Sequence, residues 1–185
     1  MGDLRGGKVK VLILSDAHVP DREKEIPKKI LEHLWENKPY DLVLYAGDLT
    51  GEEVLSLLDS LGKEVHVVRG NMDYLPLPDM KIVELDGKRV LLLHGHQVRP
   101  RGNLKALSEI AKEYNASIIV HGHLHKPLVA KEMGVLHLNP GSVTGAWGGS
   151  SLGGDPTFME LYLPNWELRL YTLRRGGMEI KKMIV

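Results

Sequence analysis

The sequence predicts an α/β protein of the α+β type, in which two stacked mixed β-sheets are flanked by helices. In its first half, short apolar segments alternate with segments of helical periodicity, which is typical of parallel strands joined by helices. In its second half, apolar segments flank short turn sequences, which is typical of antiparallel strands. We therefore expect one mostly parallel and one mostly antiparallel sheet, in a single domain over residues 1–185.

The first half alternates between strand and helix patterns. Its predicted strands are 8–14, 41–46 and 64–69. Each is a continuous apolar run bounded by turn signals, as expected of a strand buried on both faces. Helices are predicted over 23–37 and 52–61, where apolar residues recur at helical spacing, with Thr50 as the expected cap of the second helix.

The second half is rich in short strands. Its predicted strands are 81–85, 89–93, 117–120, 128–131, 135–138, 157–163, 166–173 and 178–184. One helix is expected over 103–114, and a sharp loop at 139–142. The Gly- and Ser-rich segment 144–155 predicts a mobile loop, with a lid over a site as the alternative.

Composition limits the classes of function. The 24 basic and 24 acidic residues balance, so the chain lacks the electrostatic footprint of a nucleic-acid or membrane-surface protein. It contains no Cys, so any metal site must use nitrogen and oxygen ligands. No apolar run approaches the ~20 residues of a membrane helix, and residues 1–6 carry no apolar signal core. We therefore expect a cytoplasmic protein.

Metal-competent side chains follow five of the predicted strands. They are Asp16 and His18; Asp48; Asn71 and Asp73; His94 and His96; and His121, His123 and His125. Open α/β sheets bind their ligands at the carboxyl ends of the strands, where these side chains lie. A cluster of histidines without chemical function is the alternative.

Carboxylates and imidazoles without thiolates suit Mn2+, Fe2+, Co2+, Ni2+ or Zn2+. Two adjacent cations would need a bridging carboxylate and more than six protein donors in all, and this chain offers enough of them. The strand ends therefore predict a metal site.

Five motifs resemble the ordered signature of calcineurin-like metallophosphoesterases. They are Asp-x-His, Gly-Asp, Gly-Asn-x-Asp, His and Gly-His-x-His, over residues 9–125. Gly-Asn-Met-Asp, His-Gly-His-Gln and Asn-Pro-Gly-Ser look like the compact phosphodiesterase subfamily, which includes a retromer subunit of the same fold. The resemblance implies a four-layer sandwich and hydrolysis of a small phosphate ester, with diesters preferred.

The resemblance also implies a ligand set for two divalent transition-metal ions, with Mn2+ favoured over Ni2+, Zn2+, Co2+ and Fe2+. The first ion would be held by Asp16, His18 and His125, the second by Asn71, His94 and His123, and both by Asp48. A hydroxide bridging the two ions would attack phosphorus in line, without a covalent enzyme intermediate.

The sequence departs from the family pattern at Met72. The more active members carry a histidine there, which is taken as the general acid for the leaving group. Since Met72 cannot donate a proton, we expect modest activity, best with good leaving groups. His96 is the candidate catalytic residue nearby, and a structural role is its alternative.

Other polar residues receive weaker assignments. Arg69, Arg99 and Arg101 could meet a phosphate, although solvated side chains are the simpler interpretation. Asp73 is expected to orient Asn71 or a turn amide rather than to bind metal. The role of His121 stays open, and His33, His66 and His137 are assigned no function.

The alternative function is a protein-binding scaffold, which is how the retromer relative chiefly uses this fold. Every expected ligand position is filled here, and burying seven polar groups without a metal is costly, which favours the enzyme. A nuclease is disfavoured by the neutral charge. A homo-oligomer paired through exposed strand edges stays an open alternative.

Overall fold

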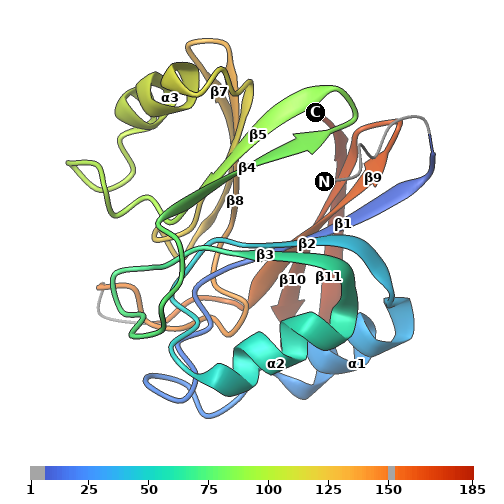
Figure 1. Cartoon of the computed structure of the whole chain (residues 1–185). Coiled ribbons are helices and arrows are strands. Elements are labelled where there is room, and N and C mark those ends of the chain that lie inside the picture. The colour runs from blue at the N-terminus through green and yellow to red at the C-terminus, as the bar shows by residue number, and fades with distance from the viewer. Residues whose placement is uncertain (1–6, 150–152) are drawn as a thin grey trace.

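The structure is a computed structural model that describes residues 7–149 and 153–185. Residues 1–6 and the centre of the predicted loop, residues 150–152, lie outside the described part. The described chain forms eleven strands and three helices, arranged in layers (Figure 1).

The first sheet has six strands. In order across the sheet they are β11 (Gly177–Ile184), β10 (Glu167–Arg174), β9 (Thr157–Leu163), β1 (Val9–Leu14), β2 (Tyr40–Tyr45) and β3 (Gly62–Val67). The first three strands of the chain run parallel, and β9 joins β1 in antiparallel register, with Val11 opposite Leu161.

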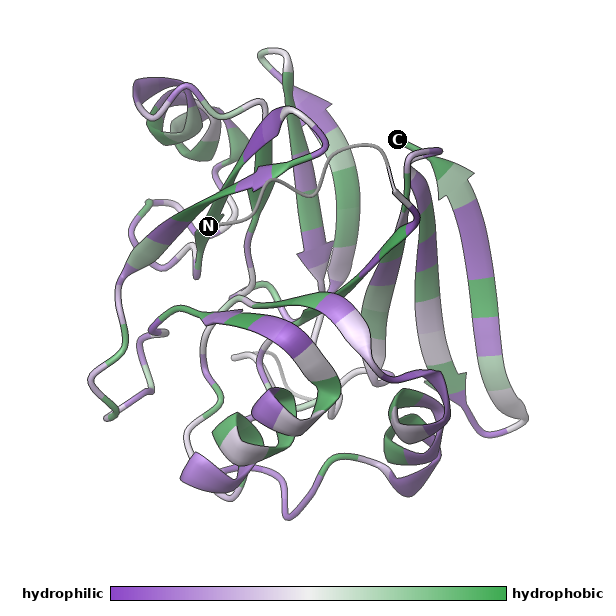
Figure 2. Ribbon diagram, turned by 45° about the vertical axis from the view of Figure 1, so that its right-hand side comes forward, coloured by the Kyte–Doolittle hydropathy of each residue, from purple (hydrophilic) through white to green (hydrophobic). Residues whose placement is uncertain are grey.

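The last three strands therefore complete the sheet of the first half, and our expectation that each half of the chain forms its own sheet was wrong. The reason lies in β9, in which six of seven residues are buried. A strand buried on both faces needs a central place between two other strands. β11 takes the edge, and Figure 2 shows it banded alternately in hydrophilic and hydrophobic colours, as expected of a half-exposed strand.

The second sheet has five strands and is mixed. In order they are β4 (Met80–Leu85), β5 (Lys88–Leu93), β6 (Ile118–Val120), β8 (Val135–Pro140) and β7 (Pro127–Glu132). The β4–β5 and β7–β8 pairs are antiparallel hairpins, whereas β5, β6 and β8 run parallel.

The helices cover the outer faces of the two sheets. They are α1 (Lys28–Asn37), α2 (Glu52–Leu61) and α3 (Leu104–Glu113). Figure 1 shows α1 and α2 below the first sheet and α3 outside the second. Along β1, Val11 and Ile13 join the apolar core between the sheets, whereas Leu12 and Leu14 pack with the residues of α1. This period-two division confirms the predicted fold class of two stacked sheets between helices.

The start of one helix and the cap of another differ from the prediction. Helix α1 begins at Lys28 instead of residue 23, because Pro27 stands at its N-cap and disfavours helical backbone in the residue before it. Helix α2 begins at the predicted residue, but its N-cap is Gly51 and no side chain caps it. The Thr50 hydroxyl instead donates to the carbonyl of Val19, 2.7 Å away.

Candidate metal centre

The polar ends of strands from both sheets meet at one place. Gly122, after β6, donates its N–H to the carbonyl of His94, after β5. A Cβ at Gly122 would lie 2.7 Å from Asp16 Oδ2 and 2.9 Å from the Ala46 carbonyl of the first sheet. Only glycine permits this close approach of the two sheets, which brings their ligand-bearing loops together.

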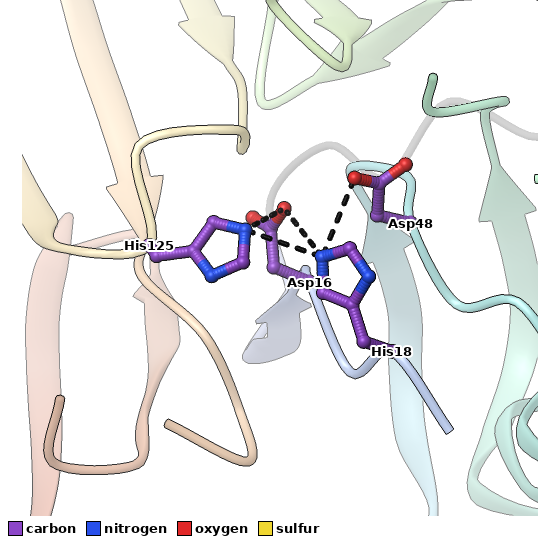
Figure 3. A group of neighbouring side chains, drawn as sticks. All are labelled: Asp16, His18, Asp48 and His125. Atoms are coloured by element: carbon purple, nitrogen blue, oxygen red, sulfur yellow. Dashed lines mark hydrogen bonds and ion pairs between the residues drawn. The ribbon is translucent and has the colours of Figure 1, made fainter. Parts of the chain in front are cut away.

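Four side chains form a first donor group, which consists of Asp16, His18, Asp48 and His125 (Figure 3). One ligand atom from each lies within 4.8 Å of the others, and all four residues are buried. His125 Nε2 lies 3.3 Å from Asp16 Oδ1, and His18 Nε2 lies 3.4 Å from Asp48 Oδ2. The group draws on three strand ends that are far apart in the sequence.

A second donor group consists of Asp48, His94 and His123. His94 Nε2 lies 3.3 Å from Asp48 Oδ2, the same oxygen that faces His18. Asp48 therefore belongs to both groups. Asn71 lies beside it, because both line a pocket of about 170 Å³ together with His123 and His125.

Hydrogen bonds through Nδ1 orient two imidazoles so that their Nε2 atoms point toward the other donors. His94 Nδ1 donates to the Ala46 carbonyl at 2.6 Å, and His125 Nδ1 donates to the Ala146 carbonyl at 2.7 Å. With its proton on Nδ1, a neutral ring carries its lone pair on Nε2, which faces the carboxylates. Backbone carbonyls thus hold both rings in the tautomer that binds metal.

Each carboxylate likewise keeps one oxygen for the centre. Asp16 Oδ2 accepts hydrogen bonds from Ser15 and from the N–H of His123, and Asp48 Oδ1 accepts from the N–H of Met72. Asp16 Oδ1 is buried and has no hydrogen-bond partner among the described residues. Donors about 2.1 Å from one ion lie about 3–4 Å apart, which matches these groups, so the residues fit divalent cations.

The buried charges shift the pKa values of the candidate ligands. Burial would raise the pKa of Asp48, but the hydrogen bond and charge of His94 hold it well below its usual range. Burial would lower the pKa of His94, but Asp48 and Asp16 raise it to about 9. Burial lowers the pKa values of His18 and His123 to about 4. Those two rings are neutral at pH 7 and able to ligate.

Asp73 orients backbone amides, as predicted. Its carboxylate accepts from the N–H groups of Asp48 and Thr50, each at 2.9 Å, and of Gly70 at 2.7 Å. A Cβ at Gly70 would lie 2.0 Å from Asp48 Oδ1, so a side chain there would displace this carboxylate. Asp73 thus fixes the loop that presents Asp48.

The prediction of a mobile loop over residues 144–155 is wrong for its first part, because residues 144–146 are packed on the site. The Thr144 hydroxyl donates to the Ala17 carbonyl at 2.9 Å, and Ala146 accepts the His125 hydrogen bond. These bonds give the segment partners that its Gly- and Ser-rich composition does not reveal. The part of the prediction that concerns residues 150–152 lies outside the described residues.

Two buried residues just before this segment hold the loops of the site, one within the second sheet and one between the sheets. Asn139, at the end of β8, donates to the Gly122 carbonyl at 2.7 Å. The Ser142 hydroxyl donates to the Asp16 carbonyl at 2.7 Å. They hold the loops that carry the candidate ligands, and the sequence prediction gave them no role.

The pocket beside the donor groups has a cationic and aromatic rim. Of the three predicted arginines, only Arg101 is among the described residues that line it, whereas Arg69 pairs with Asp79. The sequence prediction missed Arg22, which also lines the pocket. Its position four residues after His18 was the available signal. Trp147 completes the rim.

His96 and His121 lie outside the two donor groups. The ring of His96 is 5.4 Å from that of His94 and 6.5 Å from that of His123, measured between centroids. His96 is absent from the described lining of the pocket. His121 is buried behind the site, where its ring lies edge-on to His137 and near the Asn139 amide.

Known proteins are similar to this chain in sequence and in fold. A family model for the calcineurin-like phosphoesterase superfamily domain matches residues 9–159. A probable metallophosphoesterase from Methanothermobacter thermautotrophicus is 36% identical over 168 residues, which cover 89% of this chain and 92% of the relative. Another from Methanocaldococcus jannaschii is 38% identical over 139 residues, which cover 75% and 70%.

Among solved structures, wild-type Vps29 from Entamoeba histolytica complexed with Zn2+ matches with a TM-score of 0.86 and 34% identity. The match covers 95% of this chain and 98% of that one. Along the described residues, no helix combines the length and the apolar character that crossing a membrane requires. The chain belongs to the calcineurin-like phosphoesterase superfamily.

Proposed function

We propose that this protein is a phosphodiesterase that uses two divalent transition-metal ions, Mn2+ foremost, to hydrolyse a small phosphate ester. One observation carries the proposal. Two groups of donors, all buried except the half-buried His123, place nitrogens and oxygens at ligand spacing and share the single carboxylate Asp48. A shared carboxylate with two oxygens is the bridge that a dinuclear centre needs. The Zn2+ in the Vps29 structure supports a divalent transition metal.

The residues divide into two ligand sets. Asp16, His18 and His125 would hold one ion, the set His94, His123 and Asn71 would hold the other, and Asp48 would contact both. Bound divalent cations would supply Lewis-acid stabilisation of a phosphoryl group and a water of lowered pKa.

The other side chains orient the substrate and complete proton transfer. Arg22 and Arg101 line the pocket with further guanidinium donors, which suit phosphate oxygens. The chain has no Cys, and nothing in the site requires a covalent nucleophile. Met72 leaves the leaving group without a direct acid, so proton donation falls to His96, whose ring lies 5.4 Å from that of His94 and 6.5 Å from that of His123.

The test is hydrolysis of bis(p-nitrophenyl) phosphate and p-nitrophenyl phosphate after EDTA treatment and re-addition of Mn2+, Ni2+, Zn2+, Co2+ or Fe2+. We expect metal-dependent release of p-nitrophenol, faster from the diester. Asp48→Ala should abolish it. Asp59→Ala, which removes an exposed aspartate of α2, is the matched control and should keep it.

The likeness to Vps29 favours a second candidate, a protein-binding scaffold of the same fold. If the wild-type protein binds the metals but hydrolyses neither ester, the scaffold becomes the better assignment of function.

A further inference from the structure

An exposed tryptophan stands at the rim of the candidate catalytic pocket. Trp147 is 49% exposed. Among the large hydrophobic residues that are exposed in the described chain, it is the one that lines the pocket of Asp48, Asn71 and His123. An indole that is half open to solvent at the rim of a polar pocket offers a flat apolar face to a ligand, and its N–H supplies a polar edge.

Arg22 holds Trp147 relative to the donor groups. Its guanidinium Nη1 donates to the Trp147 carbonyl at 2.6 Å, and its central carbon lies 5.4 Å from the centre of an indole ring. The N–H of Arg22 donates to the carbonyl of His18, which belongs to the first donor group. The indole is therefore tied to the metal centre through one arginine.

Gly148, the residue after Trp147, packs against His125 of the first donor group. A Cβ on Gly148 would lie 2.7 Å from Cγ of His125, so the backbone here rests on the imidazole ring. Arg101 donates to the carbonyls of Gly148 and His123. The aromatic ring is thus presented beside the place where a phosphate would lie.

We infer that Trp147 determines specificity by stacking on a planar group next to the scissile phosphate, and that the substrates are small nucleoside phosphodiesters. The inference rests on the proposed function. Arginine cations match the phosphate, and an exposed indole offers every nucleobase a stacking surface. The zero net charge favours a small nucleotide over a nucleic-acid polymer.

The reaction balances with water as the only co-reactant. A P–O bond to the water oxygen forms, and the P–O bond to the leaving group breaks. One water proton goes to the leaving oxygen, and the other stays on the product monoester or passes to solvent.

The experiment compares thymidine 5′-(p-nitrophenyl phosphate) with methyl p-nitrophenyl phosphate, both with Mn2+. Both release p-nitrophenol, so only the group that stacks differs. We expect the wild type to prefer the nucleoside ester in kcat/KM by about tenfold, a typical effect of one stacked base. Trp147→Ala should lose this preference, mainly through a higher KM for the nucleoside ester. Trp147→Phe should keep most of it.

Trp35 provides the matched control, because it is 44% exposed and has Lys38 Nζ 3.7 Å from its ring centre, as Trp147 has Arg22. Trp35→Ala should keep the preference. A second readout is tryptophan fluorescence during titration with thymidine 5′-monophosphate. Saturable quenching in the wild type that disappears in Trp147→Phe supports the inference.

Two failures are distinguishable. An equal ester preference in the wild type and Trp147→Ala overturns the role of Trp147 and leaves the phosphodiesterase standing. A wild type that is inactive on both esters with Mn2+, and on bis(p-nitrophenyl) phosphate with every metal of the series, overturns the proposed function, and the assigned substrate class with it.

Discussion

Replacing Asp48 by asparagine tests whether one carboxylate serves two metal ions. Asp48 belongs to both donor groups, whereas His125 belongs to one. At a metal concentration of about 100 times Kd, each occupied site stabilises the fold by about 2.7 kcal/mol, so two sites add about 5 kcal/mol. For a chain of 185 residues this raises Tm by about 10–20 °C.

The Asp48→Asn variant should lose most of this gain. Removing a supporting residue outside the coordination shell typically costs 10–100-fold in metal affinity, and a direct ligand should cost at least about 100-fold. At the same metal concentration each site is then near its Kd, and the gain falls to about 0.4 kcal/mol per site. His125→Gln weakens only the first site and should keep about half of the wild-type shift.

The assay is scanning calorimetry with and without Mn2+, combined with metal analysis after equilibrium dialysis. The wild type and the control Asp59→Asn should each bind two equivalents. If Asp48→Asn retains two equivalents and the full Tm shift, or if His125→Gln loses as much as Asp48→Asn, the shared-ligand argument is wrong.

Three further predictions concern one buried carboxylate of the first sheet and two residues near the candidate centre. Glu160 is buried, and although burial alone would raise its pKa, hydrogen bonds from His33 and three tyrosines lower it from 4.5 to about 2. The charged form therefore contributes about 3 kcal/mol above pH 4.5, lost between about pH 4.5 and pH 2; in urea unfolding, the loss of stability over this range should be smaller by about this amount in Glu160→Gln than in the wild type. Asn139→Ala removes the side-chain hydrogen bond to the Gly122 carbonyl and should weaken Mn2+ binding at least about tenfold by titration calorimetry, whereas unchanged affinity would exclude a positioning role. His96→Asn should lower kcat about 10–100-fold for a methyl leaving group but little for p-nitrophenol, and equal losses with both would assign His96 a structural role.

The chemistry of the site was readable in the sequence because its residues are local to strand ends. Asp16, His18 and His125 follow apolar runs, and a strand buried on both faces is recognisable from consecutive residues. The structure brings together six of the seven predicted ligands in two donor groups, and Asn71 lines the pocket beside them. Their role as ligands stays a prediction that the experiments above decide.

The partners of these elements were not readable, because pairing depends on long-range contacts. β9 pairs with β1, although the two strands are about 150 residues apart in the sequence. The apolar pattern of β9 predicts that the strand is buried but not which strand it pairs with. His33 received no function from its helical position, yet it reaches Glu160 at 2.9 Å from another element. Trp147 lies in the segment predicted to be a mobile loop, and only the structure shows that Arg22 donates a hydrogen bond to its carbonyl.

The sequence by itself determined which residues can hold a cation and which segments are strands, since both depend on residue type and short-range periodicity. Only the tertiary structure decided that Asp48 faces two donor groups and that Arg22 and Trp147 border them. The physical reason is that a sheet converts distant chain segments into neighbours less than 5 Å apart, and hydrogen bonds such as that from Asn139 to Gly122 then select one arrangement of the loops.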